Sequence, residues 1–239
     1  MSCFFITGTD TDVGKTVVTA LLAAYFKQQG KNVIPYKPIQ SGGITEAGKL
    51  VAPDLQVYQC ALPELKVEEA NHYLFKLPTS PHLAARTEGS EILMAEIIDD
   101  YQALKQKYEM ILVEGAGGLI VPLNDEGDCI LHLIQEIAAP VILVARSGVG
   151  TINHTVLSVM ALKQAGIQIA GIILNRLQAE GSVVEQENQR MIERLTGVPV
   201  LGIIPYIENV EDLFKDDGEL RKVLANLQMD RIKEMEKVE

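Results

Sequence analysis

"GTDTDVGKT" occupies residues 8–16 and follows directly on the apolar stretch "CFFIT" at residues 3–7. A loop that wraps a phosphate needs backbone N–H groups that point inward, and glycine permits the dihedral angles that this requires. Lys15 adds a mobile positive charge, and the hydroxyl of Thr16 can ligate Mg²⁺. Five residues separate the first glycine from the second, one more than in the standard pattern G-x-x-x-x-G-K-[ST]. We therefore favour a variant phosphate loop that opens a helix over a glycine turn followed by a surface lysine.

Apolar stretches of strand length alternate with helix-like stretches along the chain, which is the pattern of parallel strands covered by helices. Residues 42–90, rich in proline and glycine, read as a loop-and-helix excursion. The expected strands are residues 3–7, 32–37, 110–115, 141–146, 169–175 and 200–205. The expected helices are residues 15–29, 91–107, 129–137, 151–165, 182–195 and about 219–237. We therefore predict the α/β class, a single-domain P-loop nucleotide-binding fold over residues 1–239 with a mainly parallel sheet and helices on both faces.

The composition limits the class of protein. With 47% hydrophobic and 22% charged residues, a chain of 239 residues can bury a sizeable core, which argues against disorder. The formal net charge of −11 disfavours nucleic acid as a partner, but a nucleotide needs only local N–H groups and a lysine. We expect no signal peptide and no membrane span. Cys3, Cys60 and Cys129 fit neither a disulfide framework nor a metal spacing, so we expect buried, reduced thiols in a cytoplasmic protein.

Polar residues follow each expected strand. In a parallel sheet the carboxyl ends of the strands lie on one edge, which is where doubly wound folds bind ligands. Several polar loops on that edge are hard to explain as structure alone. These polar features are the loop 8–16, Lys37 with Ser41, Glu114, the segment 147–154, Asn175, and Pro205 with Tyr206.

Each single candidate at this edge has a structural alternative. Glu114 is either an ion-paired structural group or a Mg²⁺ ligand, and we favour the ligand because hard cations at phosphate sites take carboxylates. Lys37 is either a surface lysine or a functional one, and its position at a strand end favours function. Asp54, in the irregular region, is equally well a turn residue. The segment "SGVGTINH" (147–154) is either a strand–helix turn with Thr151 as N-cap or a second anion site at a helix N-terminus.

With these features the chain resembles the dethiobiotin synthetase family, ATP-dependent ligases of biotin biosynthesis. The resemblance covers most of the chain and depends on a combination of motifs, because any one of them alone would be weak. One departure is Asp12, where the family often has glutamate, so the charge is kept and the reach is shorter. The stretch after Tyr206 matches poorly and provides no site residues. The motifs are "TGTDTDVGKT" (7–16), "YKPIQSG" (36–42), Asp54, "PTSPH" (78–82), "VEGAGG" (113–118), "GTINH" (150–154), Asn175 and "IPY" (204–206).

The resemblance implies a single α/β domain that acts as a homodimer, with 7,8-diaminononanoate, CO₂ and ATP as substrates and Mg²⁺ as cofactor. An amine of the diamine adds CO₂ to give a carbamate, whose oxygen takes the γ-phosphoryl group of ATP. The second amine then attacks the carbonyl of this carbamic–phosphoric anhydride, expels phosphate and closes the cyclic urea of dethiobiotin. The acidic charge and the lack of a long apolar run lead us to expect no nucleic acid and no membrane as partners.

The resemblance also implies roles for particular residues. Lys15 and Lys37 would balance the charge between carbamate and γ-phosphate, and Thr11 would orient the carbamate. Residues 150–153 would bind the substrate's carboxylate from the partner subunit. The implied nucleotide-binding residues are Asp12, Val13, Gly14, Lys15, Thr16, Val17, Asp54, Glu114, Gly115, Ala116, Gly117, Asn175, Arg176, Ile204, Pro205 and Tyr206. The implied substrate-binding residues are Ser41, Gly150, Thr151 and Asn153, and the implied Mg²⁺ ligands are Thr16, Asp54 and Glu114.

Two other functions share parts of this pattern. A nucleotide-driven switch of the partition and maturation ATPase kind would typically carry a second lysine inside the phosphate loop, where this chain has Asp10 and Asp12. An amidoligase of cobalamin-type synthesis would need a glutamine-hydrolysing domain, and we expect none because the stretch after residue 206 is too short. The sequence therefore favours the ligase. ATP turnover that needs the diamine and CO₂ would separate a ligase from a switch.

Overall fold

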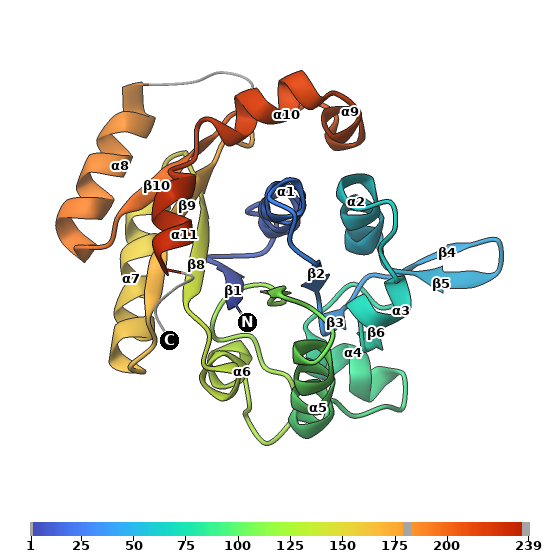
Figure 1. Cartoon of the computed structure of the whole chain (residues 1–239). Helices are drawn as coiled ribbons and strands as arrows, with labels where there is room; N and C mark the ends of the chain where they lie inside the picture. Colours follow the sequence, from blue (N-terminus) through green and yellow to red (C-terminus); the bar gives the residue numbers. More distant parts are fainter. Residues whose placement is uncertain (1, 179–182, 236–239) are drawn as a thin grey trace.

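The central sheet has six strands in the order β10-β9-β8-β1-β7-β2 (Figure 1). The structure is a computed structural model that describes residues 2–178 and 183–235. Neighbouring strands of this sheet pair in parallel, which confirms the predicted α/β class. All six expected strands are present, with small shifts at their ends. They are β1 (Ser2–Gly8), β2 (Val33–Tyr36), β7 (Met110–Glu114), β8 (Val141–Arg146), β9 (Ile169–Asn175) and β10 (Val200–Ile204).

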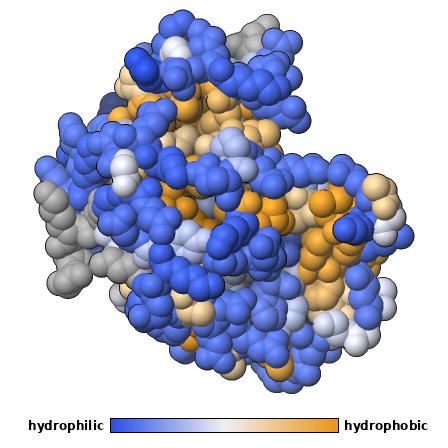
Figure 2. All heavy atoms as spheres, turned by 45° about the vertical axis from the view of Figure 1, so that its right-hand side comes forward, coloured by the Kyte–Doolittle hydropathy of each residue, from blue (hydrophilic) through white to orange (hydrophobic). Residues whose placement is uncertain are grey.

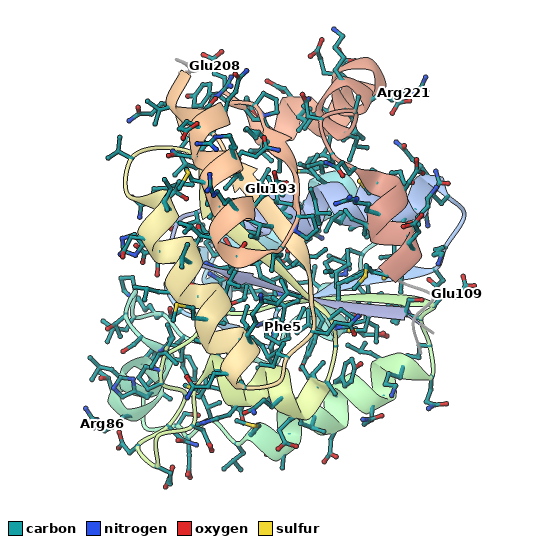
Figure 3. The ribbon with its side chains drawn as sticks, turned by 90° about the vertical axis from the view of Figure 1, so that its left-hand side faces the viewer. Phe5, Arg86, Glu109, Glu193, Glu208 and Arg221 are labelled. Carbon is teal, nitrogen blue, oxygen red and sulfur yellow. The ribbon has the colours of Figure 1, made fainter. Side chains whose placement is uncertain are left out.

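Continuous apolar sequence explains why these strands lie inside the protein. Every residue of β7 is buried, as expected for a parallel strand that is covered on both faces. Successive side chains alternate between the faces, so Phe5 packs in one hydrophobic cluster while Phe4 and Ile6 pack in another. Figure 3 shows Phe5 in the interior, whereas Arg86 and Arg221 lie at the outer edge. The sheet therefore has a hydrophobic core on each face.

Helices cover both faces of the sheet, as predicted. The cluster around Phe5 includes residues of α5, α6, α7 and α8, and the cluster around Phe4 includes residues of α1, α9, α10 and α11. The outer face drawn in Figure 2 is mostly hydrophilic, in keeping with the net charge of −11. Within the described ranges, no helix is long and apolar enough to cross a membrane. The helices are α1 (Lys15–Gln28), α5 (Met94–Lys105), α6 (Ile130–Ile137), α7 (Thr151–Gln164), α8 (Val183–Thr196), α9 (Val210–Lys215), α10 (Asp217–Leu224) and α11 (Met229–Met235).

The order of the strands reverses beside β1. The chain builds β2 and β7 on one side of β1 and then adds β8, β9 and β10 on its other side. In open α/β sheets such a reversal leaves a crevice at the carboxyl ends of the strands. Glu114, the last residue of β7, is opposite Ile6 of β1, and Gly8 at the end of β1 is opposite Val144 of β8. The loop that follows Gly8 and the carboxylate of Glu114 therefore belong to one crevice.

Residues 39–87 contain more regular structure than the sequence predicts. β3 (Ile39–Gln40) pairs with β6 (Tyr73–Leu74), and β4 (Ile44–Glu46) forms a hairpin with β5 (Lys49–Val51). Pro53 and Pro81 stand in the first turns of two helices, where a missing N–H breaks no bond inside the helix. Asp54 therefore lies in the first turn of a helix. The helices of this region are α2 (Pro53–Ala61), α3 (Val67–Ala70) and α4 (Pro81–Thr87).

The expected single helix at residues 219–237 is wrong, because the described part of it forms two helices. Between α10 and α11, Leu227 forms an isolated bridge with Gly202, and the N–H of Gln228 donates to the carbonyl oxygen of Leu201 at 2.6 Å. The break lets the backbone pair with β10, a tertiary contact that the helical spacing of apolar residues cannot reveal. Residues 236 and 237 of that expected helix, and residue 182 of the expected helix 182–195, lie outside the described residues.

The cysteine prediction is confirmed only in part. All three cysteines are free, but Cys129 is buried whereas Cys3 and Cys60 are partly exposed. Burial nevertheless raises the pKa of the Cys3 thiol to about 12.

Candidate nucleotide and metal site

The phosphate loop runs from the end of β1 to the start of α1. Gly14 is the N-cap of α1 with a φ of 92°, and Asp12 has a φ of 55°. Glycine is needed at position 14 for two reasons: its φ lies in the left-handed region, and a Cβ there would collide with the side-chain amide of Asn175. The first N–H groups of a helix lack partners inside it and favour an anion. The local geometry is therefore that of an anion cradle at the start of α1.

Asn175 supports this loop from the carboxyl end of β9, which lies two strands away from β1 in the sheet. Its Nδ2 donates a 3.0 Å hydrogen bond to the carbonyl oxygen of Val13, and Val13 itself is fully buried. Across the loop, Lys15 Nζ donates to the carbonyl oxygen of Asp10 at 3.0 Å. The loop is thus fixed both to the sheet and across its own span.

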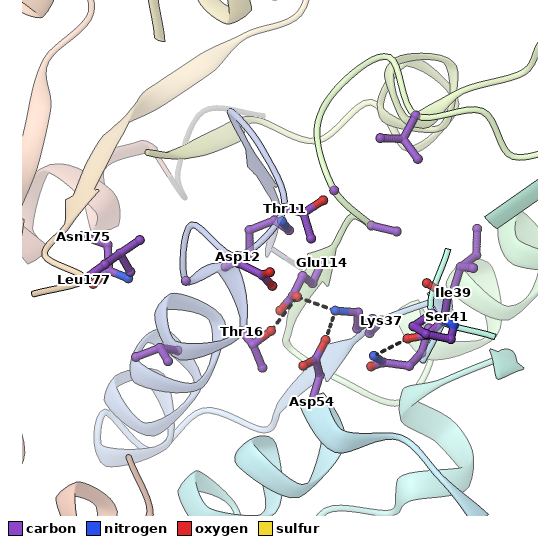
Figure 4. A pocket seen from close by; sticks show the side chains of 18 of the residues that line it. Thr11, Asp12, Thr16, Lys37, Ile39, Ser41, Asp54, Glu114, Asn175 and Leu177 are labelled. Carbon is purple, nitrogen blue, oxygen red and sulfur yellow. Dashed lines mark hydrogen bonds and ion pairs between the residues drawn. The ribbon is translucent and has the colours of Figure 1, made fainter. Parts of the chain in front are cut away.

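A pocket of about 790 Å³ opens at this crevice. Figure 4 shows Asn175 towards one end of it and Lys37 with Ser41 towards the other. The structure brings together most of the predicted site residues from six separate parts of the chain. The predicted residues that line the pocket are Thr11, Asp12, Gly14, Lys15, Thr16, Val17, Lys37, Ser41, Asp54, Glu114, Ala116, Gly117, Asn175, Arg176 and Tyr206.

Lys37 is at the centre of a buried charge cluster in this pocket (Figure 4). Its Nζ lies 2.7 Å from Glu114 Oε1 and also forms an ion pair with Asp54 Oδ2. Lys37 is 6% exposed and Glu114 is fully buried. Thr16 Oγ1 donates to Glu114 Oε1 at 2.9 Å, and the Tyr58 hydroxyl donates to Glu114 Oε2 at 2.5 Å. Both oxygens of Glu114 therefore have hydrogen-bond donors, as a buried carboxylate requires.

The two lysines of the pocket have opposite pKa shifts. Burial lowers the pKa of Lys15, and the charge of Lys37 adds to this effect while that of Glu114 opposes it. Burial also acts to lower the pKa of Lys37, but the carboxylates of Glu114 and Asp54 outweigh it and the pKa is raised. Lys37 therefore holds its proton firmly, whereas a nearby anion would stabilise the charge on Lys15.

The side-chain oxygens of Glu114 and its neighbours suit Mg²⁺ as ligands. The hydroxyl of Thr16 and the carboxylates of Asp54 and Glu114 all line the pocket next to the phosphate loop. Mg²⁺ usually takes one or two carboxylates together with substrate phosphates rather than a cage made of protein alone. Among the described residues, no group of three or more His, Cys, Asp or Glu side chains is placed to hold a metal ion. The donor set therefore fits a metal that nucleotide phosphates help to hold.

Some predicted site residues lie outside the lining of the pocket. Gly150 is the N-cap of α7, with a φ of 90°, and Thr151 is the first helical residue, so the expectation that Thr151 caps the helix is wrong. Thr151 is 2% exposed and its hydroxyl lies 3.3 Å from that of Thr155, which turns its side chain towards the protein. Asn153 is exposed. The predicted residues outside the lining are Val13, Gly115, Gly150, Thr151, Asn153, Ile204 and Pro205.

Helix α8 forms hydrogen bonds with two loops, the one after β8 and the one after β9. Glu185 accepts hydrogen bonds from the hydroxyl of Ser147 at 2.7 Å and from two nitrogens of Arg176 at 3.0 and 2.6 Å. Asn188, about one turn later, donates to the carbonyl oxygen of Ser147 at 2.9 Å. The guanidinium of Arg176 is therefore held by Glu185, although the residue also lines the pocket. One helix fixes both the loop after β8 and the loop after β9.

Sequence reasoning missed part of the site. It did not find Tyr58, which stands four residues after Asp54 and so shares a face of α2 with it. Recognition of α2 as a helix would have provided that signal. The motif "PTSPH" (78–82) did point to the next part of the pocket, but residues 78–81 were given no individual roles from the sequence. The other lining residues without a predicted role are Ile39, Gln40, Pro78, Thr79, Ser80, Pro81, Val121, Leu177, Ile207 and Val210.

Comparison with known sequences gives close matches over most of the chain. A family model described as "AAA domain" (AAA_26) matches residues 3–213. A protein of Halalkalibacterium halodurans named ATP-dependent dethiobiotin synthetase BioD is 44% identical over 97% of this chain and 96% of its own. A protein of the same name from Anoxybacillus flavithermus is 48% identical over 87% of this chain and 94% of its own. Another protein of that name, from Bacillus subtilis strain 168, is 39% identical over 88% of this chain and 90% of its own.

Solved structures share the fold at low sequence identity. A chain of the MinC:MinD cell division protein complex of Aquifex aeolicus superposes with a TM-score of 0.60 and 18% identity, over 98% of this chain and 96% of that one. The septum site-determining protein MinD of Pyrococcus horikoshii, complexed with Mg-ADP, gives a TM-score of 0.57 and 19% identity over 100% and 99%. At such identities the likeness shows the fold alone. That fold is the P-loop NTPase fold that the sequence predicts.

Proposed function

The chain belongs to the ATP-dependent dethiobiotin synthetase family, and we propose that it closes the ureido ring of dethiobiotin from 7,8-diaminononanoate and CO₂, with ATP and Mg²⁺. It is an ATP-dependent ligase of biotin biosynthesis that acts on small molecules. The observation that carries the finer proposal is the position of Lys37, which lies between the carboxylates of Asp54 and Glu114 in the pocket of the phosphate loop. Phosphoryl transfer needs this combination of cation, metal ligands and anion cradle.

The nucleotide would lie along the pocket from the phosphate loop towards β9 and β10. The N–H groups of residues 12–17 would cradle its phosphates, and residues 115–117 would line the opposite side. Asn175, Arg176 and residues 204–206 would contact the adenine. Val13 and Ile204 are fully buried, so their contribution would come from the backbone.

Thr16, Asp54 and Glu114 would hold Mg²⁺. The metal supplies charge neutralisation for the phosphate oxygens. Lys37 pairs with the same two carboxylates, those of Asp54 and Glu114. Its ammonium would therefore turn from them towards the γ-phosphate and the carbamate when the nucleotide binds. This exchange of partners would place a full positive charge at the point where negative charge develops.

The reaction would run in three steps. One amine of the diamine adds to CO₂ and loses a proton, and Thr11 and Ser41 orient the carbamate that forms. A carbamate oxygen attacks the γ-phosphorus of ATP and ADP leaves, while Lys15 and Lys37 balance the charge on the transferred group. The second amine attacks the carbonyl of the anhydride and loses a proton, and phosphate leaves as the cyclic urea closes. The protein positions and neutralises the reactants and forms no covalent bond to them.

Each active site would be completed by a second copy of the chain. Residues 150–153 open α7, and their N–H groups would bind the far carboxylate of the substrate in the partner's site. Apolar side chains near this segment are exposed, with Val149 at 88%, Leu157 at 56% and Met160 at 60%. Exposed apolar residues of this kind suit a twofold contact. In this proposal residues 1–239 act as one domain, in a homodimer, in the cytoplasm.

ATP turnover with each substrate omitted in turn tests the proposed function. The purified protein should release phosphate only when the diamine, a source of CO₂ and Mg²⁺ are all present. A product with the mass of dethiobiotin should form in the same amount as the phosphate. Phosphate release that does not need the diamine would contradict the proposal and favour a nucleotide-driven switch.

A further inference from the structure

Tyr58 is a buried tyrosine that contacts the charge cluster from outside the pocket. Its side chain is fully buried, and its hydroxyl donates to Glu114 Oε2 at 2.5 Å. It belongs to α2, one turn after Asp54, so one face of this helix delivers both an ion-pair partner for Lys37 and a hydrogen-bond donor for Glu114. None of the reaction steps above uses Tyr58.

The two oxygens of Glu114 have different surroundings. Oε1 is 2.7 Å from Lys37 Nζ and 2.9 Å from Thr16 Oγ1, both of which line the pocket. Oε2 receives the hydroxyl of Tyr58, which is not among the lining residues. A carboxylate that is anchored through one oxygen presents the other in a fixed direction, because rotation about its last bond would break the anchoring hydrogen bond.

We propose that Tyr58 is a positioning residue that holds Glu114 so that Oε1 is the oxygen presented to Mg²⁺ and to Lys37. Hydrogen bonds to the free side of a metal ligand orient it and tune its affinity. Without the hydroxyl, the buried Oε2 would lose its donor, and the plane of the Glu114 carboxylate could rotate so that no oxygen keeps the direction that Oε1 has towards Lys37 and Thr16. The inference depends on the proposed Mg²⁺ site and adds the residue that fixes its geometry.

The experiment compares Tyr58→Phe with wild type in Mg²⁺-dependent nucleotide binding, measured by isothermal titration with ADP. We expect the Mg²⁺ concentration that gives half of the metal-dependent gain in affinity to rise about tenfold in Tyr58→Phe, the lower end of the effect of removing such a hydrogen bond. Binding of ADP in EDTA should stay within about twofold of wild type, because the phosphate loop is untouched. Tyr101→Phe is the matched control: Tyr101 is also buried, but its hydroxyl faces Cys3.

A double variant separates positioning from a general packing effect. Glu114→Gln removes the charge that Tyr58 orients, so adding Tyr58→Phe to it should raise the Mg²⁺ requirement by less than about twofold. Equal effects of Tyr58→Phe in both backgrounds, or a Mg²⁺ requirement like that of wild type and Tyr101→Phe, would overturn the inference. Tyr58→Met removes the same hydroxyl and replaces Tyr58→Phe if the latter does not fold. If wild type itself shows no Mg²⁺-dependent binding, the proposed function fails and not this inference alone.

Discussion

Lys37 Nζ and Glu114 Oε1 lie 2.7 Å apart, with both side chains almost entirely removed from solvent. Because Asp54 also pairs with Lys37, one ammonium compensates two carboxylates. A buried group of this kind is unstable when one partner is removed, since the remaining charge stays uncompensated. The cluster therefore links the stability of the protein to its chemistry, and variants of Lys37 should reveal both.

Lys37→Ala should lower turnover by about 10²-fold or more, the scale of losing a preorganised electrostatic group. It should also lower the free energy of unfolding by on the order of 3 kcal/mol, because Glu114 loses its cation. Urea unfolding and turnover measure the two effects. Lys37→Met should lose stability for the same reason, and adding Glu114→Gln to Lys37→Met should restore much of that stability and none of the activity. Wild-type turnover in folded Lys37→Ala would remove Lys37 from the chemistry.

Gly14→Ala should abolish tight nucleotide binding. A Cβ at this position is strained by the φ of 92° and collides with the amide of Asn175. Gly30→Ala is the matched control, because Gly30 has a φ of 82° and a Cβ there meets nothing within 4 Å. The control should lose only about 1–2 kcal/mol of stability from the left-handed backbone and bind nucleotide normally. Equal nucleotide affinities in the two variants would show that the packing of Asn175 against the loop is unimportant.

Glu185→Ala should weaken nucleotide binding and lower stability, because it leaves Arg176 and the hydroxyl of Ser147 without the acceptor that joins their loops. A loss of about 1–3 kcal/mol in the free energy of unfolding is typical of buried groups that lose a partner. Glu187→Ala, on the same helix, removes an exposed pair with Arg190 and should change little. Chemical denaturation measures the free energy of unfolding of both variants, and ADP titration measures their nucleotide affinity. Equal values for Glu185→Ala and Glu187→Ala would argue that Glu185 does not join the two loops.

Mixed dimers should show whether a site is shared between two chains. Lys15→Ala spoils the phosphate half of a site, and Asn153→Glu should repel the substrate's carboxylate from the other half. Asn153 suits this purpose better than Thr151, since Thr151 is buried and a charge there would disturb α7. Random remixing makes half of the dimers mixed, each with one intact site, so activity should recover to about a quarter of wild type. Confirmed subunit exchange without recovery would place the whole site within one chain.

The protein should lose stability in the alkaline range, in part through Cys3. Burial raises the pKa of this thiol from about 9.0 to about 12, so the folded state holds the proton more tightly than the unfolded state. The contribution is therefore complete below about pH 9 and is lost as the pH rises towards about 12. Urea midpoints of wild type and Cys3→Ala at about pH 8 and about pH 10.5 measure it. Between these two pH values the urea midpoint should fall less in Cys3→Ala than in wild type. An equal fall in both proteins would assign the effect to other groups.

The features that depend on short stretches of sequence were predictable. The apolar strands, the glycine-rich loop and Glu114 at a strand end all follow from residues that are neighbours in the chain, and the structure confirms their placement. Fold alone could not separate a ligase from a protein of another kind, because a chain of the MinC:MinD cell division protein complex and the septum site-determining protein MinD share the fold at 18% and 19% identity. Relatives at 39–48% identity make that distinction.

The features that depend on tertiary contacts were not predictable in the same way. The pairing of Lys37 with Glu114 joins residues that are 77 positions apart, and nothing local shows that Asp54 shares the same ammonium. The end of α10 is fixed by pairing with Gly202, and the direction of Thr151 is fixed by its contact with Thr155. Tyr58 was missed because the proline-rich composition of its region hid a helix that Pro53 in fact begins.

The place of β1 in the sheet also has a consequence for biosynthesis. β1 is made before both of its partners, because β7 ends only at Glu114 and β8 only at Arg146. At usual rates of translation the backbone edges of β1 stay unpaired, and its apolar side chains uncovered, for on the order of ten seconds while the ribosome makes the intervening chain. Unpaired apolar strands of nascent chains are prone to aggregation. Yield in cells should therefore depend on chaperone capacity and on the speed of translation as well as on the stability of the finished fold.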